Sequence, residues 1–333
     1  MGTIFYMREN TYFTCHPLVP PLFTVMRLLP LLLLPVLVLA TPFRPADLPA
    51  GSAWFLHVDH DAVRSAPLGA SLMSQPIDDA SCPLPPKAKA FLTETGFDYR
   101  RDLRALTVFG SGAERQASIL VRHSADDLKV GEFLRQQGAK TTTVEGAPCL
   151  AYDCGPDGNE CTLFIAFPQP GVIAIGMSAK DLGLALRSLE SDRAESALPA
   201  LAAQEGIASP SVLAAVDMVA CAEANPRLPA MARQFRVFGM AAGEVGDKVV
   251  FRSRTEMVQA PMADNVVKMV EGFAAMAASR DANAASWLEG LAVKASGAQV
   301  TTDYQVSAQR VLEEIARAKV RMAEWRAKRA AGK

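Results

Sequence analysis

The sequence LTVFG at Leu106–Gly110 has a counterpart in FRVFG at Phe235–Gly239. Both copies end in Val-Phe-Gly, and each is followed by a polar turn containing glycine and by a second run of β-forming residues. In the second runs apolar and polar residues alternate, as they do in a strand with one covered face. The chain is therefore predicted to contain two related hairpins, at Leu103–Arg122 and at Phe235–Met257.

The elements around the two hairpins follow the same order. Each region begins with a strand and continues with a helix, the hairpin, a second helix and a further hairpin. The first region has an extra hairpin before its closing helix. We match the turn at Glu145-Gly146 with the turn at Ser296-Gly297. We predict an α+β protein made of two tandem repeats of a β-α-β-β-α-β-β unit, with mainly antiparallel sheets, helices packed on one face and a long C-terminal helix. One shared sheet and two separate sheets both fit this pattern.

The composition changes between 190 and 210, where the chain is rich in alanine and acidic residues and contains Pro199 and Pro210. We place the domain boundary here. The prediction is a first α+β repeat domain at 41–198 and a second at 199–333, which includes the C-terminal helix.

The N-terminal region has the pattern of a secretory signal peptide. Met26-Arg27 precedes a continuous apolar run from Leu28 to Ala40, with small residues before the expected cleavage between Ala40 and Thr41. The run is shorter than the roughly 20 residues that a membrane-spanning helix needs. Translation starting at Met26 would explain the long segment upstream. We predict export to the periplasm or the medium with residues 1–40 removed, the alternative being a membrane tether formed by an uncleaved anchor. No transmembrane helix is expected in the mature chain.

The overall charge and the motifs exclude several functional classes. The formal net charge is −1, whereas nucleic-acid binding needs a strongly basic face. The Gly110-Ser111-Gly112 sequence lacks the third glycine and the strand-to-helix context of a dinucleotide site, and the chain has no phosphate-binding loop motif. We expect no nucleic acid and no cofactor.

His57, Asp59 and Asp61 form the densest group of candidate catalytic or metal-binding residues. On a single strand from Trp54 to Asp61 these three side chains would share one face, which suits a hard cation or a general base. The competing interpretation is that Asp59 caps the following helix. It is favoured because Asp217 occupies the equivalent place in the second region without a histidine beside it. We therefore assign no metal site and no catalytic residue, and retain these three as weak metal candidates.

Five cysteines follow the expected cleavage point, an odd number for an oxidising compartment. If 155–160 is a hairpin loop, Cys154 and Cys161 lie opposite each other and could form a disulfide. Free or differently paired thiols are the alternative.

Two helices in the second region are predicted from apolar spacing. One, at Met262–Ala278, is expected to turn Val266 and Phe273 towards the sheet. The other, at Ser307–Lys333, has a narrow apolar stripe with eight Lys or Arg against three Glu. The stripe is expected to pack on its own domain, the alternative being peripheral contact of this basic helix with an anionic membrane surface.

The leader together with Leu48–Ala50 and Trp54–Asp59 resembles exported bacterial proteins of uncharacterised function that carry a signal peptide and duplicated α+β units. The resemblance covers mainly the leader and the first strand, and it implies no activity. We predict an exported non-enzymatic protein that acts through protein–protein or cell-envelope contacts. The alternative is an exported hydrolase or metal-dependent enzyme centred on His57, Asp59 and Asp61.

Overall fold

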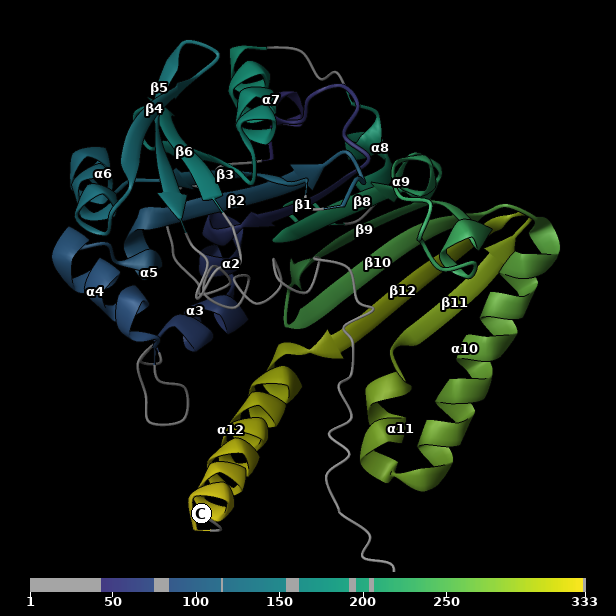
Figure 1. Ribbon diagram of the computed structural model, residues 1–333. Coiled ribbons are helices and arrows are strands. Elements are labelled where there is room, and N and C mark those ends of the chain that lie inside the picture. The colour runs from purple at the N-terminus through teal and green to yellow at the C-terminus, as the bar shows by residue number, and fades with distance from the viewer. Residues whose placement is uncertain are drawn as a thin grey trace, which may run out of the picture.

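The computed structural model describes residues 43–74, 84–114, 116–153, 162–191, 196–203 and 207–331. These residues form one twelve-stranded antiparallel sheet in the order β11-β12-β10-β9-β8-β1-β2-β3-β7-β6-β5-β4 (Figure 1). The strands are β1 (Trp54–Asp59), β2 (Leu103–Gly110), β3 (Ser118–His123), β4 (Lys140–Val144), β5 (Ala147–Asp153), β6 (Thr162–Gln169), β7 (Val172–Gly176), β8 (Val212–Asp217), β9 (Phe235–Val245), β10 (Lys248–Met257), β11 (Leu291–Ser296) and β12 (Gln299–Ser307). The helices are η1 (Pro45–Asp47), α2 (His60–Ser65), α3 (Pro67–Met73), α4 (Pro86–Thr95), α5 (Tyr99–Asp102), α6 (Asp127–Gln136), α7 (Ala179–Glu190), α8 (Leu198–Ala202), α9 (Met218–Ala224), η2 (Ala232–Gln234), α10 (Ala260–Arg280), α11 (Ala282–Leu288) and α12 (Ala308–Ala331).

The α+β class, the antiparallel pairing and the long C-terminal helix are confirmed. The predicted first strand coincides with β1, and the hairpin at Leu103–Arg122 is the β2–β3 pair. In the part of the chain that the structure describes, no helix combines the length and apolar character needed to cross a membrane.

The two halves of the sheet meet at the antiparallel pair of β1 and β8, in which Trp54 lies opposite Val216. Moving outward, β2, β3 and β7 follow on one side and β9, β10 and β12 on the other. The two predicted regions therefore contribute to one shared sheet. The hairpin beside β10 is β11–β12, and the hairpin beside β3 is β6–β7. We matched the Glu145-Gly146 turn with the Ser296-Gly297 turn, and this match is wrong. The Glu145-Gly146 turn joins β4 to β5 at the edge of the sheet, whereas the hairpin in the place that corresponds to β11–β12 is β6–β7.

The main core lies on both faces of β2, because consecutive residues of a strand point to opposite sides. Phe109 belongs to an apolar cluster with residues of α7 and α8, whereas Val108 belongs to a second cluster with residues of α6. Our expectation that helices pack on one face is therefore wrong for this part of the sheet. With helices on both sides, β2 is buried along nearly its whole length.

The glycine that ends both Val-Phe-Gly sequences is required by close packing. A Cβ added to Gly110 would lie 2.6 Å from the carbonyl oxygen of Gln116 and 2.9 Å from the Trp54 ring. A Cβ added to Gly239 would lie 1.8 Å from the carbonyl oxygen of Leu201 in α8. Glycine is thus needed at both positions, but for different contacts. Gly110 packs against the Trp54 ring and the backbone at Gln116, whereas Gly239 packs against the backbone of α8.

Candidate functional site

The predicted cluster begins with His57, which is buried within the sheet. The imidazole is 2% exposed, and its Nδ1 lies 2.9 Å from the hydroxyl oxygen of Thr107 on β2. Its ring also contacts Phe43, with 5.0 Å between the ring centres. Burial, assisted by the charges of Arg122 and His60, lowers the pKa of His57 to about 3. The side chain is therefore a neutral imidazole at physiological pH.

Asp59 ends β1 and begins α2, where its carboxylate accepts a hydrogen bond of 2.8 Å from the backbone N–H of Ala62. Asp217 does the same after β8, accepting from the backbone N–H groups of Val219 and Ala220. The cap interpretation is confirmed for both. Burial raises the pKa of Asp59 to about 6, opposed by the Ala62 N–H and the charge of Arg64.

Asp61 does not join the other two, because the chain is already helical at His60 and our extended strand to Asp61 is wrong. The carboxylate of Asp61 pairs with Arg64 one turn later, and both side chains are fully buried. Arg64 also donates to the backbone carbonyl of Arg100 at 3.0 Å. Among the described residues, no group of three or more His, Cys, Asp or Glu is arranged to hold a metal ion.

The contact between Thr107 and His57 has the atom types of a nucleophile and a base. It lacks access to a substrate, because both side chains are almost fully buried and neither lines the polar pocket or the apolar cavity described below. A pKa near 3 also makes His57 a weak proton acceptor. We therefore interpret the pair as a hydrogen bond between β1 and β2 that satisfies the Thr107 hydroxyl and the Nδ1 of His57, while the Nε2 of His57 is buried without a hydrogen-bond partner among the described residues.

A buried ion pair that the sequence did not indicate lies close to this region. Both carboxylate oxygens of Asp47 accept hydrogen bonds of 2.8 Å from the Arg122 guanidinium. Asp47 belongs to the short helix η1, which precedes β1 in the chain. The two residues are 75 positions apart, so no local spacing could have indicated the pair. It fixes η1 against β3.

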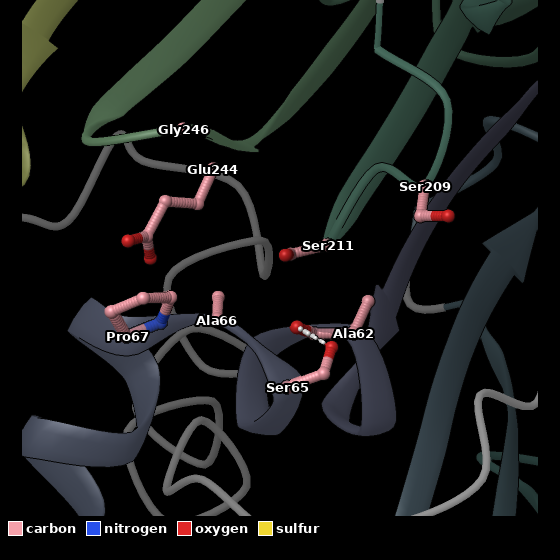
Figure 2. A pocket seen from close by; sticks show the side chains of 8 residues that line it. All are labelled: Ala62, Ser65, Ala66, Pro67, Ser209, Ser211, Glu244 and Gly246. Carbon is pink, nitrogen blue, oxygen red and sulfur yellow. Dashed lines mark hydrogen bonds between the residues drawn. The ribbon is translucent and has the colours of Figure 1, made fainter.

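A small polar pocket lies between α2–α3 and the ends of β8 and β9, as Figure 2 shows. Its volume is about 210 Å³, and it is lined by Ala62, Ser65, Ala66, Pro67, Ser209, Ser211, Glu244 and Gly246. The Glu244 carboxylate accepts from the backbone N–H of Leu68 in the first turn of α3, at 3.0 and 3.2 Å. Burial raises the pKa of Glu244, partly offset by that hydrogen bond. The Ser65 hydroxyl donates to the carbonyl of Ala62 at 2.9 Å.

These contacts make the pocket a junction between the N-terminal helices and β9. Its one carboxylate stabilises the start of α3, where the helix dipole favours negative charge. A single carboxylate with serine hydroxyls does not form a nucleophile–base pair.

The described cysteines are buried thiols. Cys149 lies on β5 and Cys221 on α9, and both are free. Burial raises the pKa of both, and for Cys221 burial and the Asp217 charge raise it to about 11. The predicted disulfide between Cys154 and Cys161 and the cleavage point at Ala40 and Thr41 lie outside the described residues.

The second half of the chain has exposed apolar side chains on α10. Met269, Phe273 and Met276 are 51%, 59% and 43% exposed, and their spacing places them on one side of the helix. Our prediction that Phe273 faces the sheet is wrong. The small cluster beneath α10 uses residues of its first two turns, such as Ala263 and Val266, and the helix continues past them (Figure 1).

The basic helix α12 packs near its beginning and extends away from the sheet at its end (Figure 1). Val311 and Ile315 are half-buried, and α12 contacts α3 and β12. Further along, Val320 is 59% exposed and Trp325 is 57% exposed. The first part of α12 therefore contacts α3 of the first predicted domain as well as β12 of its own, so the expected packing on its own domain holds only in part.

No protein-family model matches the chain, and no curated protein matches it. Solved structures of TP0453 do align with it. Crystal form I covers 83% of this chain and 97% of its own at 11% identity, with a TM-score of 0.43. Crystal form IV gives the same coverage and identity with a TM-score of 0.44, and form III gives 12% identity with a TM-score of 0.42. Likeness at this level says nothing about function.

Proposed function

We propose that this is an exported, non-enzymatic protein that acts by protein–protein contact through the outer face of α10. The observation that carries the proposal is the stripe of Met269, Phe273 and Met276, three large apolar side chains exposed on one side of one helix. Contiguous exposed apolar patches on soluble proteins mark interaction sites. Anchors at i, i+4 and i+7 are the pattern with which a helix docks into an apolar groove.

The charge on α10 favours a protein partner over a lipid surface. Asp264 and Glu271 balance Lys268 and Arg280, so the helix has no net charge. Helices that lie on anionic membranes are rich in Lys and Arg on their polar face. The basic helix α12 is the better candidate for envelope contact, and it provides the alternative outcome in the test below.

Export is part of the proposal and rests on the leader at 26–40. Compartment matters for the partner, because a periplasmic or extracellular partner would meet the mature chain only after cleavage. Mass spectrometry of the protein recovered from the periplasmic fraction should give Thr41 as its first residue. Recovery from the cytoplasm with residues 26–40 intact would overturn this part.

We also propose that the chain consists of two tandem repeats, divided near 198/199. Support comes from the order of strands outward from the β1–β8 pair, β2-β3-β7 against β9-β10-β12. Further support comes from the aspartate cap that follows the first strand of each half, Asp59 before α2 and Asp217 before α9.

Site-specific photocrosslinking tests the function. A photoreactive phenylalanine analogue is placed at Phe273, and the matched control carries it at Glu271, which is exposed on the other side of the same helix. In intact cells we expect a discrete protein adduct from position 273 and none from 271. An adduct with the mass of two copies of this chain would identify the partner as a second copy.

Two results would overturn the proposal. One is a set of adducts that does not differ between the two positions. The other is the absence of a protein adduct at 273 together with sedimentation of the purified protein on anionic phospholipid vesicles, lost when Arg317 and Arg321 of α12 are changed to Glu. That result would assign the contact to the envelope surface.

A further inference from the structure

The N-terminal half contains an apolar cavity of about 290 Å³, separate from the polar pocket and from α10. It lies between α4, α6 and the face of the sheet formed by β2, β3, β6 and β7. The lining consists of apolar and aromatic side chains, with no charged group among them: Leu84, Ala88, Phe91, Leu92, Phe97, Tyr99, Leu103, Val121, Val130, Leu134, Ile165, Ile173 and Ile175.

The walls of the cavity are fixed by packing on several sides. Phe91 on α4 meets Phe133 on α6 edge to face, with 5.4 Å between ring centres, and it also contacts Phe97 at 5.5 Å. The floor belongs to the cluster that contains the buried residues Leu103, Val130 and Ile165. Collapse of the walls is therefore restricted, and an empty space of this size would leave the lining atoms without dispersion partners.

The small side chain of Ala88 is one reason that the space exists. Neighbouring lining positions on α4, Phe91 and Leu92, carry large side chains, whereas Ala88 contributes a single methyl group. The volume is about twice that of the apolar cavity of roughly 150 Å³ that accepts benzene, which corresponds to about ten to twelve carbon atoms. A cavity without charges selects an apolar ligand.

A cation on α4 is adjacent in sequence to the lining residues, although it does not itself line the cavity. Lys87 lies between the lining residues Leu84 and Ala88 in sequence, and one turn before Phe91. Its ammonium group is exposed and lies 3.4 Å from the hydroxyl of Tyr152, at the limit of a hydrogen bond. A negatively charged ligand end placed here would find both a charge and a hydroxyl donor.

We propose that this cavity binds an unbranched acyl chain of about ten to twelve carbons, with its anionic end at Lys87 and Tyr152. The chain fills the apolar volume, and the head group stays at the solvent-exposed rim. The proposal concerns a ligand and goes beyond the contact function assigned to α10.

Calorimetric titration of the purified mature chain with saturated fatty acids of increasing length tests the fit. We expect the affinity to rise about fourfold for each added methylene, the value for complete burial of a CH₂ group. The rise should stop near ten to twelve carbons, where the cavity is full. Absence of binding, or a rise that continues unchanged to much longer chains as in non-specific association, would overturn the assignment.

Two pairs of variants locate the ligand. Ala88→Phe fills the cavity and should weaken dodecanoate binding at least tenfold, because several methylenes of the ligand can then no longer be buried. Ala90→Phe, on the other side of α4, is the matched control and should leave the affinity for dodecanoate within about twofold. Lys87→Ala should weaken dodecanoate but not dodecanol, with Lys89→Ala as control. Equal effects in the first pair would overturn the site, and equal effects in the second would overturn the placement of the head group.

A final arm distinguishes the source of the chain. Dodecanoate and a single-chain phospholipid with a dodecanoyl group are compared below their micelle-forming concentrations. Tighter binding of dodecanoate identifies a free fatty acid, and tighter binding of the phospholipid identifies a lipid-derived chain. Failure of both to bind would overturn the proposal without touching the photocrosslinking result at α10.

Discussion

His57 should make the protein sensitive to acid, and replacing it should remove that sensitivity. The imidazole is buried, and its pKa is lowered to about 3 in the folded state, against about 6.5 for an exposed histidine. As the pH falls below about 6.5, the unfolded chain binds a proton that the folded chain cannot. The stabilisation present above that pH is therefore lost progressively as the pH falls towards the folded pKa.

The size of the effect follows from the two pKa values. Each pH unit between them changes the free energy of unfolding by about 1.36 kcal/mol, so the loss between about pH 6.5 and about pH 5 is about 2 kcal/mol. Any folded pKa below about 4 gives the same value, because the folded imidazole is then neutral throughout this range. Asp59 acts in the opposite direction, since its pKa is raised to about 6 and acidification favours the folded state. Asp59 is present in every variant compared, so its contribution cancels.

Urea unfolding of the wild type and of His57→Gln, at about pH 7.5 and about pH 5, measures the difference. The gap in unfolding free energy between the two proteins should shift by about 2 kcal/mol in favour of the variant at the lower pH. Thr107→Val is the matched control, because it removes the hydrogen bond and keeps the imidazole, so it should lose stability at both pH values and retain the acid sensitivity. A gap between wild type and His57→Gln that is the same at both pH values would refute the reasoning.

The remaining predictions concern packing and burial. Asp47→Asn should lower the unfolding free energy by about 3 kcal/mol, because it leaves the Arg122 charge buried without its carboxylate partner; thermal or urea unfolding measures this. Gly239→Ala should lower it by more than about 3 kcal/mol, because a Cβ at this position would lie 1.8 Å from a backbone oxygen of α8, which has to move. Cys149 and Cys221 should resist iodoacetamide in the native protein at about pH 8 and react in urea, because burial raises both thiol pKa values; peptide mapping by mass spectrometry separates them from the other cysteines.

Each of these has a contrary result. If Asp47→Asn unfolds with the same free energy as the wild type, the charge of Asp47 contributes nothing to stability beyond what a neutral asparagine provides. Gly272→Ala is the control for the glycine prediction, since nothing lies within 4 Å of the added Cβ and helix propensity alone should stabilise it slightly. Equal unfolding midpoints for the two glycine variants would contradict the packing argument. Labelling of Cys221 in the native state at the rate seen in urea would show that α9 opens readily.

The strands and the principal helices could be read from the sequence because their signals are local. The run with few polar residues at Leu103–Phe109 indicates a strand covered on both faces, and β2 is buried along nearly its whole length. The alternation along Lys248–Met257 predicted a strand there with one covered face; the strand is β10, but Val250 and Ser253, which point to opposite sides of it, are both buried. The aspartate caps were also readable, since Asp59 and Asp217 each directly precede a helix. These patterns depend on residues within a few positions of each other in the chain. They would therefore be the same in any fold built from these strands and helices.

Sequence reasoning failed where contacts join distant segments. Phe273 has the spacing of an inward-facing residue, yet α10 extends past the part of the sheet that could cover it. Asp61 is different, because its partner Arg64 is only three positions away: grouping it with His57 required the strand to continue to Asp61, and the helix that begins at His60 prevents this. The Asp47–Arg122 pair, the pocket at Glu244 and the apolar cavity beneath α4 all depend on segments brought together by the sheet.

For the hairpin at Leu103–Arg122, the sequence by itself determined the two strands and the turn between them. Only the tertiary structure decided that β1 and β8 pair, that one sheet serves both halves, and that helices cover both faces of β2. The reason is physical. Secondary structure is set by residues a few positions apart, whereas strand order, buried charge pairs and cavities are set by which surfaces exclude water together.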